Sequence, residues 1–153
     1  MTDVRTATPY TLVSAVAQPV DASKRELRRI SRQIEDEALR SRPPAVAAAL
    51  QDARYVTPPT RAVYARLAEQ GTPARLFARG LQSWLAPGVA GVTLDDDDPL
   101  VDEWVIVLPG PAPVAFAATD LGVADCADDD RSFRYAITRD PDVVAGCARL
   151  LGL

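Results

Sequence analysis

Three adjacent acidic residues, Glu35, Asp36 and Glu37, stand in residues 30–41, whose apolar residues recur at helical spacing. Clustered carboxylates can serve acid–base catalysis, hold a metal ion, form a polar binding edge or face water. Successive side chains of a helix point about 100° apart, so these three cannot converge on one ion. Asp36 stands four residues from an arginine on each side, which favours a surface ion ladder. Two interpretations remain: a solvated face, or Glu35 and Asp36 contacting a buried arginine or a polar ligand.

A second group of residues combines aromatic rings with arginines. A buried tryptophan needs an acceptor for its N–H, and the arginine fork suits a carboxylate or a phosphate. These residue types would therefore suit a ligand-binding cleft. The alternative is that Trp104, Tyr64 and Phe133 are core residues and that Arg131 pairs with the aspartates before it. The candidate site residues of this group are Gln51, Arg54, Tyr55, Tyr64, Trp104, Arg131 and Phe133, which join Glu35 and Asp36.

Two aspartate-rich runs, "DDDDP" (residues 95–99) and "DCADDD" (residues 125–130), raise the question of a metal site. Calcium loops need spaced oxygen ligands, a glycine turn and a closing bidentate acid, and neither run has that layout. We therefore expect solvated loops and no metal site.

The chain contains no histidine and only two cysteines, Cys126 and Cys147. The absence of histidine removes the commonest general base and any Ser/His or Cys/His nucleophile system. No serine stands in a nucleophile-elbow context, so we expect no catalytic residues and no enzymatic activity. Cys147 falls on the apolar side of a predicted C-terminal helix and is expected in the core. The residues point to no particular cofactor.

The charge is distributed unevenly along the chain. The formal net charge is −4 and the pI is near 4.8, which argues against general nucleic-acid binding. Residues 1–80 nevertheless carry 13 Lys and Arg against 8 Asp and Glu, and residues 81–153 carry 4 against 13. The basic run "SKRELRRISRQ" lacks a glycine-rich loop or an aromatic platform, so it favours a protein partner over nucleic acid. No stretch is long enough to span a membrane, and we expect a cytoplasmic protein without a membrane partner.

The chain of 153 residues supports one domain. Residues 1–22 are predicted to be a loosely ordered leader, interrupted by Pro9 and Pro19, before a single domain over residues 23–153. A capping box of Ser23 and Glu26 predicts a helix that ends at Pro43, and "TPPT" predicts a second helix before Gly71.

The strands are predicted between the second helix and a last helix capped by Asp140. Residues 45–51 form a buried strand or a helical turn, residues 74–80 a strand, and residues 91–94 a short strand. Residues 104–109 and 114–119 form a hairpin, followed by a half-exposed strand over residues 133–138. The expected fold is α+β, with a mostly antiparallel sheet of four or five strands flanked by the N-terminal, second and C-terminal helices.

Five segments in this order resemble the DICT sensory domain, a signalling module of bacteria and archaea. They are "SRQIEDEAL", "LQDARYV", "YARLAEQG", "DPLVDEWVIVL" and "DRSFRYAITRDPDVV", and the resemblance spans residues 23–152. No segment is specific alone; their order and spacing carry the resemblance. One departure is Leu50, where the family tends to have phenylalanine.

The resemblance implies a sensory or regulatory role coupled to a histidine kinase, a cyclic-dinucleotide enzyme or a transcription regulator. No catalytic or DNA-binding domain is attached in this sequence, so we expect a stand-alone, non-enzymatic domain that binds a small ligand or a protein partner. The alternative is an interaction adaptor without a small-molecule ligand. The sequence does not identify the signal, the partner or the oligomeric state.

Overall fold

The computed structural model describes residues 7–122 and 128–153. Its elements are, in chain order, α1 (Pro9–Ser14), β1 (Val20–Ser23), α2 (Lys24–Ser41), β2 (Val46–Asp52), η1 (Ala53–Tyr55), α3 (Pro58–Glu69), β3 (Ala74–Arg79), β4 (Trp84–Ala86), β5 (Val89–Thr93), η2 (Pro99–Asp102), β6 (Glu103–Leu108), β7 (Val114–Asp120), η3 (Asp128–Asp130), β8 (Ser132–Thr138) and α4 (Pro141–Leu150). The predicted hairpin is β6 and β7, and the segment left open between strand and helical turn is β2.

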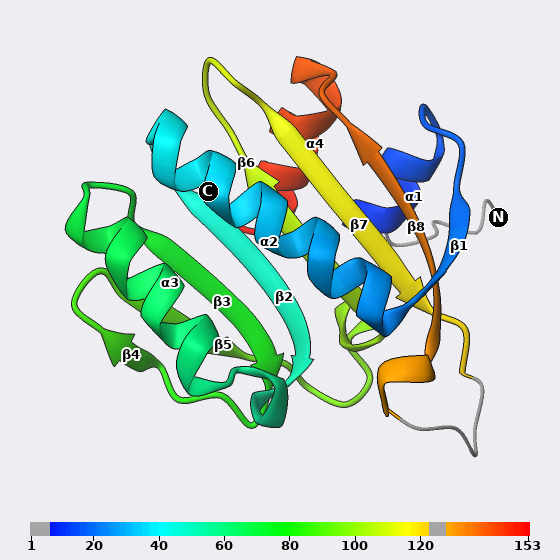
Figure 1. Ribbon diagram of the computed structural model, residues 1–153, viewed down its shortest axis with the longest axis horizontal. Helices are drawn as coiled ribbons and strands as arrows, with labels where there is room; N and C mark the ends of the chain where they lie inside the picture. Colours follow the sequence, from blue (N-terminus) through cyan, green and yellow to red (C-terminus); the bar gives the residue numbers. More distant parts are fainter. Residues whose placement is uncertain (1–6, 123–127) are drawn as a thin grey trace, which may run out of the picture.

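The strands form one sheet of eight, in the order β1-β8-β7-β6-β2-β3-β5-β4 (Figure 1). The α+β class is confirmed, but the expectation of four or five mostly antiparallel strands is wrong. The sheet is mixed, because β3 runs parallel to both β2 and β5. A parallel pair needs a crossover connection, and α3 provides it between β2 and β3.

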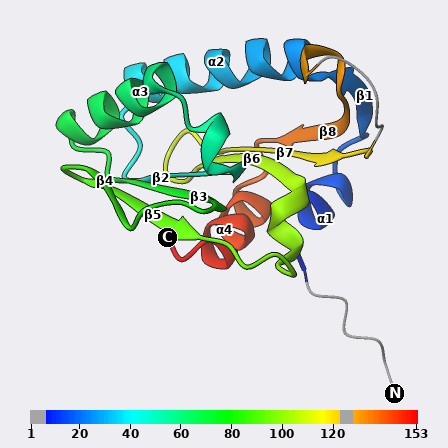
Figure 2. The same cartoon turned by 90° about the horizontal axis from the view of Figure 1, so that it is seen from below.

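Helices cover both faces of the sheet (Figure 2). One face carries α2 and α3, and the other carries α1 and α4. Two apolar clusters fill the spaces between these layers: one includes Leu27 of α2 and Tyr64 of α3, and the other includes Val13 of α1 and Cys147 of α4. Strands buried on both faces carry nearly continuous apolar residues, which explains the "VAAAL" of β2.

Covering both faces also bears on two expectations about exposure. Strand β8 is half-exposed as predicted, since Arg134 and Ile137 are exposed, but its second face is partly covered, because Ala136 is buried against the α1 and α4 layer. The segment predicted to be a loosely ordered leader contains α1 and β1 in its described part, residues 7–22. A capping box of Thr8 and Thr11 begins α1, and β1 pairs with β8. Cys147 is buried, as predicted, whereas Cys126 lies outside the described residues.

The capping chemistry fixes where α2 begins. The Ser23 hydroxyl accepts a hydrogen bond from the Glu26 N–H, and the Glu26 side chain accepts one from the Ser23 N–H. Arg42 ends the helix in a left-handed conformation with φ of 49°, just before Pro43. The predicted apolar stripe of α2 packs on the sheet through Leu27, Ile34 and Ala38. This start and this orientation decide which other residues of α2 face the gap toward α3.

Candidate functional site: a cleft between α2 and α3

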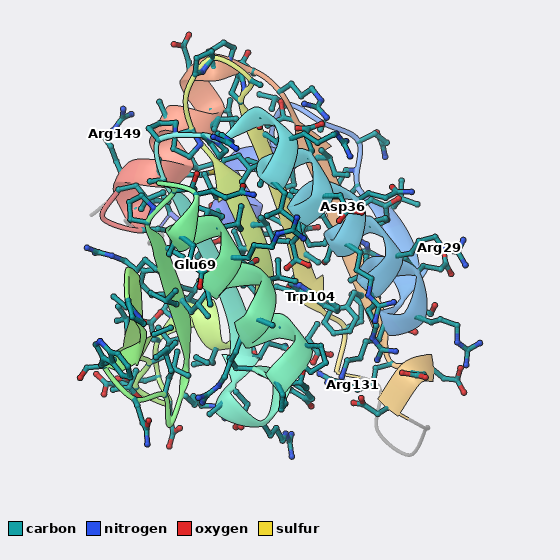
Figure 3. All side chains as sticks on the ribbon, turned by 60° about the vertical axis from the view of Figure 1, so that its left-hand side comes forward. Arg29, Asp36, Glu69, Trp104, Arg131 and Arg149 are labelled. Atoms are coloured by element: carbon teal, nitrogen blue, oxygen red, sulfur yellow. The ribbon has the colours of Figure 1, made fainter. Side chains whose placement is uncertain are left out.

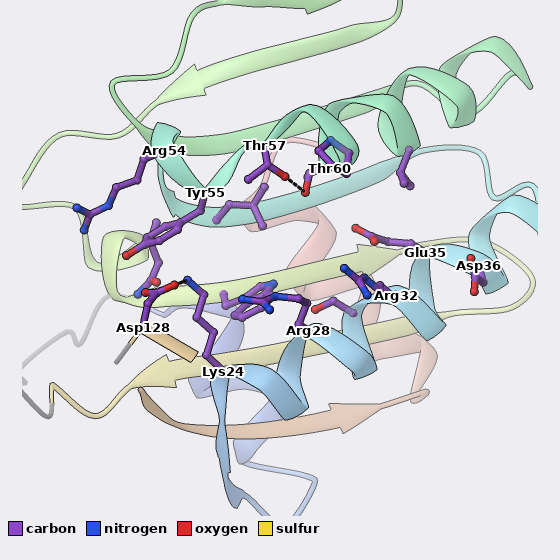
Figure 4. A pocket seen from close by; sticks show the side chains of 16 residues that line it. Lys24, Arg28, Arg32, Glu35, Asp36, Arg54, Tyr55, Thr57, Thr60 and Asp128 are labelled. Atoms are coloured by element: carbon purple, nitrogen blue, oxygen red, sulfur yellow. Dashed lines mark hydrogen bonds and ion pairs between the residues drawn. The ribbon is translucent and has the colours of Figure 1, made fainter. Parts of the chain in front are cut away.

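A cleft of about 630 Å³ lies between α2 and α3, above the ends of β2 and β6 (Figure 4). The floor includes Leu50, Gln51 and Trp104, and the α3 side includes Pro59, Thr60 and Val63. This volume is in the range of pockets that hold cofactors and small ligands.

One face of α2 forms the opposite wall. Lys24, Arg28, Ser31 and Glu35 line the cleft at intervals of four, three and four residues, which places them one above another on a helix. This polar stripe lies beside the apolar stripe that packs on the sheet. A second polar stripe at helical spacing is the sequence signal that would have identified Lys24, Arg28 and Ser31, which sequence reasoning missed.

Two buried polar atoms in the cleft wall lack a hydrogen-bond partner among the described residues: the hydroxyl of Ser31 and the indole Nε1 of Trp104. Ser31 is only 5% exposed. The Trp104 ring is fixed by edge-on contacts with Phe133 and Phe116, with centroids 5.9 Å and 6.4 Å away. Figure 3 labels Trp104 between α2 and α3. A buried donor without an acceptor costs free energy, so both atoms are suited to a group that enters the cleft.

Glu35 and Tyr64 lie close together at one end of the cleft. Burial raises the pKa of Glu35, and the nearby hydroxyl of Tyr64 only partly offsets this effect. Tyr64 is fully buried, and both its burial and the Glu35 charge hold its pKa well above its usual value. The Tyr64 hydroxyl makes no direct hydrogen bond among the described residues. The carboxyl of Glu35 therefore lies in the cleft wall without a strong donor.

Cations surround the ring of Tyr55 at the other end. The Lys24 Nζ lies 3.9 Å from the ring centroid, and the guanidinium carbons of Arg54 and Arg131 lie 4.9 Å and 5.5 Å away. Lys24 also pairs with Asp128, with Nζ and Oδ2 2.5 Å apart. Cations so placed are attracted by the negative face of the ring. The basic end with Tyr55, where Asp128 pairs with Lys24, lies opposite the end that carries Glu35, Asp36 and Arg32 (Figure 4).

Arg131 does not line the cleft, but it contacts the residues of this basic end. It pairs with Asp120, and its Nη1 donates to the Tyr55 hydroxyl over 2.8 Å. Gln51 joins the same network by donating to Asp120 and accepting from Arg131. Gln51 has a φ of 71°, a left-handed conformation that costs a non-glycine residue free energy.

The ionisation of Asp120 and Arg131 is coupled. Burial opposes the charge of Asp120, but the Gly122 N–H, Arg131 and Gln51 donate to it and lower its pKa. Burial likewise opposes the charge of Arg131, but Asp120 outweighs it and raises the pKa of the guanidinium. Both groups therefore remain charged near neutral pH.

The short helix η3 joins the start of α2 to this network. Its three aspartates pair with three basic residues of α2: Lys24 with Asp128, Arg28 with Asp129, and Arg25 with Asp130. The hydrogen bond from Lys24 lowers the pKa of Asp128. The basic first part of the sequence and the acidic second part therefore form ion pairs with each other here. A ligand that contacts Lys24 or Arg28 would compete with these pairs and so change the position of η3.

Most of the candidate residues come together in this cleft. Its lining includes Glu35, Asp36, Gln51, Arg54, Tyr55 and Trp104. The other three lie behind the wall: Tyr64 and Phe133 are fully buried, which fits the core interpretation, and Arg131 holds Tyr55. Whether any of the nine contacts a ligand stays a prediction.

Two further observations concern metal ions and membranes. Within residues 7–122 and 128–153, no group of three His, Cys, Asp or Glu side chains could hold a metal ion. None of the helices in this described part combines the length and the apolar character that crossing a membrane requires.

The domain therefore has three layers and a cleft that is lined by both polar and apolar side chains. The family model described as the sensory domain in diguanylate cyclases and two-component system matches residues 8–119. The chain therefore belongs to the DICT family of sensory domains found in signalling proteins. The match begins at residue 8, within the segment predicted to be a leader. Among curated proteins, none matches this sequence.

Solved structures share the fold at low sequence identity. NucT from Helicobacter pylori is 8% identical, with a TM-score of 0.57 over 88% of this chain and 92% of that chain. Polyphosphate kinase from Porphyromonas gingivalis is 14% identical, with a TM-score of 0.57 over 90% of this chain but 26% of that chain. TrmBL2, an archaeal chromatin protein, is 13% identical, with a TM-score of 0.51 over 97% of this chain and 53% of that chain. These similarities concern the fold alone.

Proposed function

We infer that the protein is a non-enzymatic sensory domain that binds a small ligand in the cleft between α2 and α3. The observation that carries this proposal is that two residues of the cleft wall, Ser31 and Trp104, each bury a polar side-chain atom that has no hydrogen-bond partner among the described residues. A purely structural gap between two helices would be filled by apolar side chains or would have its polar atoms paired.

The signal passes from the cleft to a protein partner through α2 and η3. Lys24 and Arg28 line the cleft and also pair with η3, so a ligand that competes for either residue changes the η3 contacts. The partner is a cytoplasmic signalling protein such as a histidine kinase, a cyclic-dinucleotide enzyme or a transcription regulator. The family's presence in signalling proteins supports this choice.

The alternative is an adaptor that docks through charge alone and has no small-molecule ligand. The exposed arginines Arg25 and Arg29 on the outer face of α2 favour this second candidate. It predicts that filling the cleft changes no binding behaviour.

A cavity-filling substitution distinguishes the two. The full chain is incubated with a small-molecule extract of its host cells, washed and denatured, and the released compounds are measured by mass spectrometry. The larger side chain in Thr60→Trp would project into the cleft. We therefore expect this variant to retain at least about tenfold less compound than the natural chain. The matched control is Ala62→Trp, an exposed position of α3 outside the cleft lining, which should retain the compound. Equal retention by both variants, or no retained compound at all, contradicts the ligand-binding function and leaves the adaptor.

A further inference from the structure

The cleft offers its polar groups in a fixed order along α2, and this order restricts the chemistry of a ligand. Ser31 and Glu35 are four residues apart on one face of the helix, so their Cβ atoms lie about 5–6 Å apart. Trp104 lies on the floor beneath α2. All three residues line this one cleft, and a flat group has the shape to lie between the helix and the floor.

Trp104 requires an acceptor, and the Ser31 hydroxyl can donate to the same group. An indole N–H can only donate, and this one has no partner among the described residues. The ligand must therefore present an oxygen or an unprotonated nitrogen at this point. The surrounding Leu50, Val63 and Pro59 provide apolar surface, which suits a ring more than a hydrated chain.

Glu35 requires a donor. Its carboxyl lines the cleft and is largely removed from water, and the Tyr64 hydroxyl and the charge of Arg32 offset the effect of this burial on its pKa only in part. A buried carboxylate is stabilised when N–H groups donate to it. The ligand therefore presents an N–H beside the acceptor that meets Trp104 and Ser31, and a cyclic amide has this arrangement of adjacent C=O and N–H.

The opposite end of the cleft requires negative charge. Arg54 lies over the Tyr55 ring and, like Arg32 near Glu35, makes no ion pair within residues 7–122 and 128–153, unlike Lys24 and Arg28. An unpaired guanidinium at the mouth of a pocket is well suited to a phosphate or a carboxylate, which it can bind through two parallel hydrogen bonds.

We propose that the cleft binds a phosphorylated planar heterocycle with a cyclic amide edge, the amide facing Glu35, Ser31 and Trp104 and the phosphate facing Arg54. This inference rests on the proposed ligand-binding function and adds the chemical class of the ligand. Guanine, uracil and flavin rings all provide such an edge, so the test compares three sources of the same chemistry.

Binding of GMP, UMP and FMN to the full chain is measured by calorimetry and compared with AMP. AMP has a similar ring and the same phosphate as GMP but lacks the cyclic amide. We expect at least one of the three to bind at least about tenfold more tightly than AMP, because a site built for hydrogen bonds rejects an analogue that leaves them unpaired. The probe that binds is also compared with its unphosphorylated form, which is guanosine, uridine or riboflavin. We expect the unphosphorylated form to bind more weakly.

Matched variants assign each contact. Glu35→Gln should remove most of the preference over AMP, whereas Glu69→Gln, the same change at an exposed position of α3, should keep it. Trp104→Phe keeps a ring but removes the N–H and should weaken the amide probe more than AMP, with Trp84→Phe on exposed β4 as control. Arg54→Ala should abolish the advantage of the phosphorylated probe over its nucleoside, and Arg61→Ala, exposed on α3, should not.

Three outcomes overturn the inference: AMP binding as tightly as the best amide probe, no amide probe binding at about 1 mM, or unchanged preference in Glu35→Gln. If a compound of another class is retained from the cell extract and is lost in Thr60→Trp, only the ligand class is wrong. If nothing is retained from the extract either, the proposed ligand-binding function fails as well.

Discussion

The Arg131 guanidinium donates a hydrogen bond to the Tyr55 hydroxyl, with Nη1 and the oxygen 2.8 Å apart. This contact joins the start of β8 to η1 across 76 residues of sequence. Arg131 is therefore a supporting residue of the cleft wall, and it does not line the cleft itself. The sequence left two interpretations of Arg131 open, a ligand contact or a pairing with the aspartates before it, and the structure contains such a pair with Asp128.

Replacing Arg131 should therefore reduce stability as well as binding. Arg131→Ala leaves Asp120 half-buried without its cation and frees Tyr55, which should lower the free energy of unfolding by about 1–3 kcal/mol. Urea unfolding followed by tryptophan fluorescence measures this change. The control is Arg134→Ala, whose exposed pair with Asp21 should contribute little. Equal stability of the two variants would show that the Arg131 network is dispensable for the fold.

The caps of α2 and α3 offer a second comparison. Ser23 accepts a hydrogen bond from the backbone of α2, whereas Thr57, at the equivalent position of α3, makes no such bond and contacts Thr60 instead. Ser23→Ala should therefore lower the free energy of unfolding by about 0.5–2 kcal/mol, and Thr57→Ala by clearly less. Chemical denaturation of both variants checks this, and a larger loss for Thr57→Ala would contradict the assignment.

Two glycines should respond to alanine with opposite signs. A Cβ at Gly91 of β5 would lie 1.8 Å from the backbone oxygen of Gln82, an atom that cannot move without displacing the chain before β4. Gly91→Ala should therefore lower the free energy of unfolding by about 3 kcal/mol or prevent folding.

Gly146, inside α4, has its nearest neighbour at an ordinary 3.4 Å from the added Cβ. Because glycine is unfavourable within a helix, Gly146→Ala should raise stability by about 0.5–1 kcal/mol. Thermal unfolding of both variants tests the pair. A loss of stability in Gly146→Ala similar to that in Gly91→Ala would contradict the packing described for α4.

The sequence predicted those elements whose signals are local. The capping box at Ser23, the proline-initiated helices and the β6–β7 hairpin all depend on residues close to one another in the chain. The additional strands were missed because β1 and β4 have only four and three residues and stand beside prolines or glycines. Such short strands depend on their neighbours in the sheet, and the pairing of β3 with β5 has no local signal.

The site was predictable to a similar extent. Residue chemistry singled out Trp104, Tyr55 and Arg54, which the fold brings to one cleft. The stripe of Lys24, Arg28 and Ser31 was treated as a basic surface, because the sequence cannot tell which side of a helix a second helix will cover. The position of Arg131 behind the cleft wall depends on its pairing with Asp120 of a neighbouring strand, and the sequence could not predict this either.

The last prediction concerns the charge on Glu35 and its dependence on pH. Burial raises the pKa of Glu35 in the folded chain above the usual value of 4.5, so the folded state binds its proton more tightly than the unfolded state does. The unliganded protein therefore loses stability from this group as the pH rises from below 4.5 through the raised pKa. Glu35→Gln removes the ionisation and should make the unliganded protein more stable than the natural chain at pH 7, with the difference shrinking toward pH 4.

The pKa values of other carboxyl groups are shifted in both directions. Burial also raises the pKa of Glu103, while hydrogen bonds from Arg139 and Lys24 lower those of Glu37 and Asp128. Only the difference between variant and natural chain isolates Glu35, and it is measured by urea unfolding at both pH values with Glu69→Gln as control. A variant that is less stable than the natural chain at pH 7 would show that Glu35 is stabilised in its charged form by the protein itself, and the carboxyl would then have no need of a ligand's N–H.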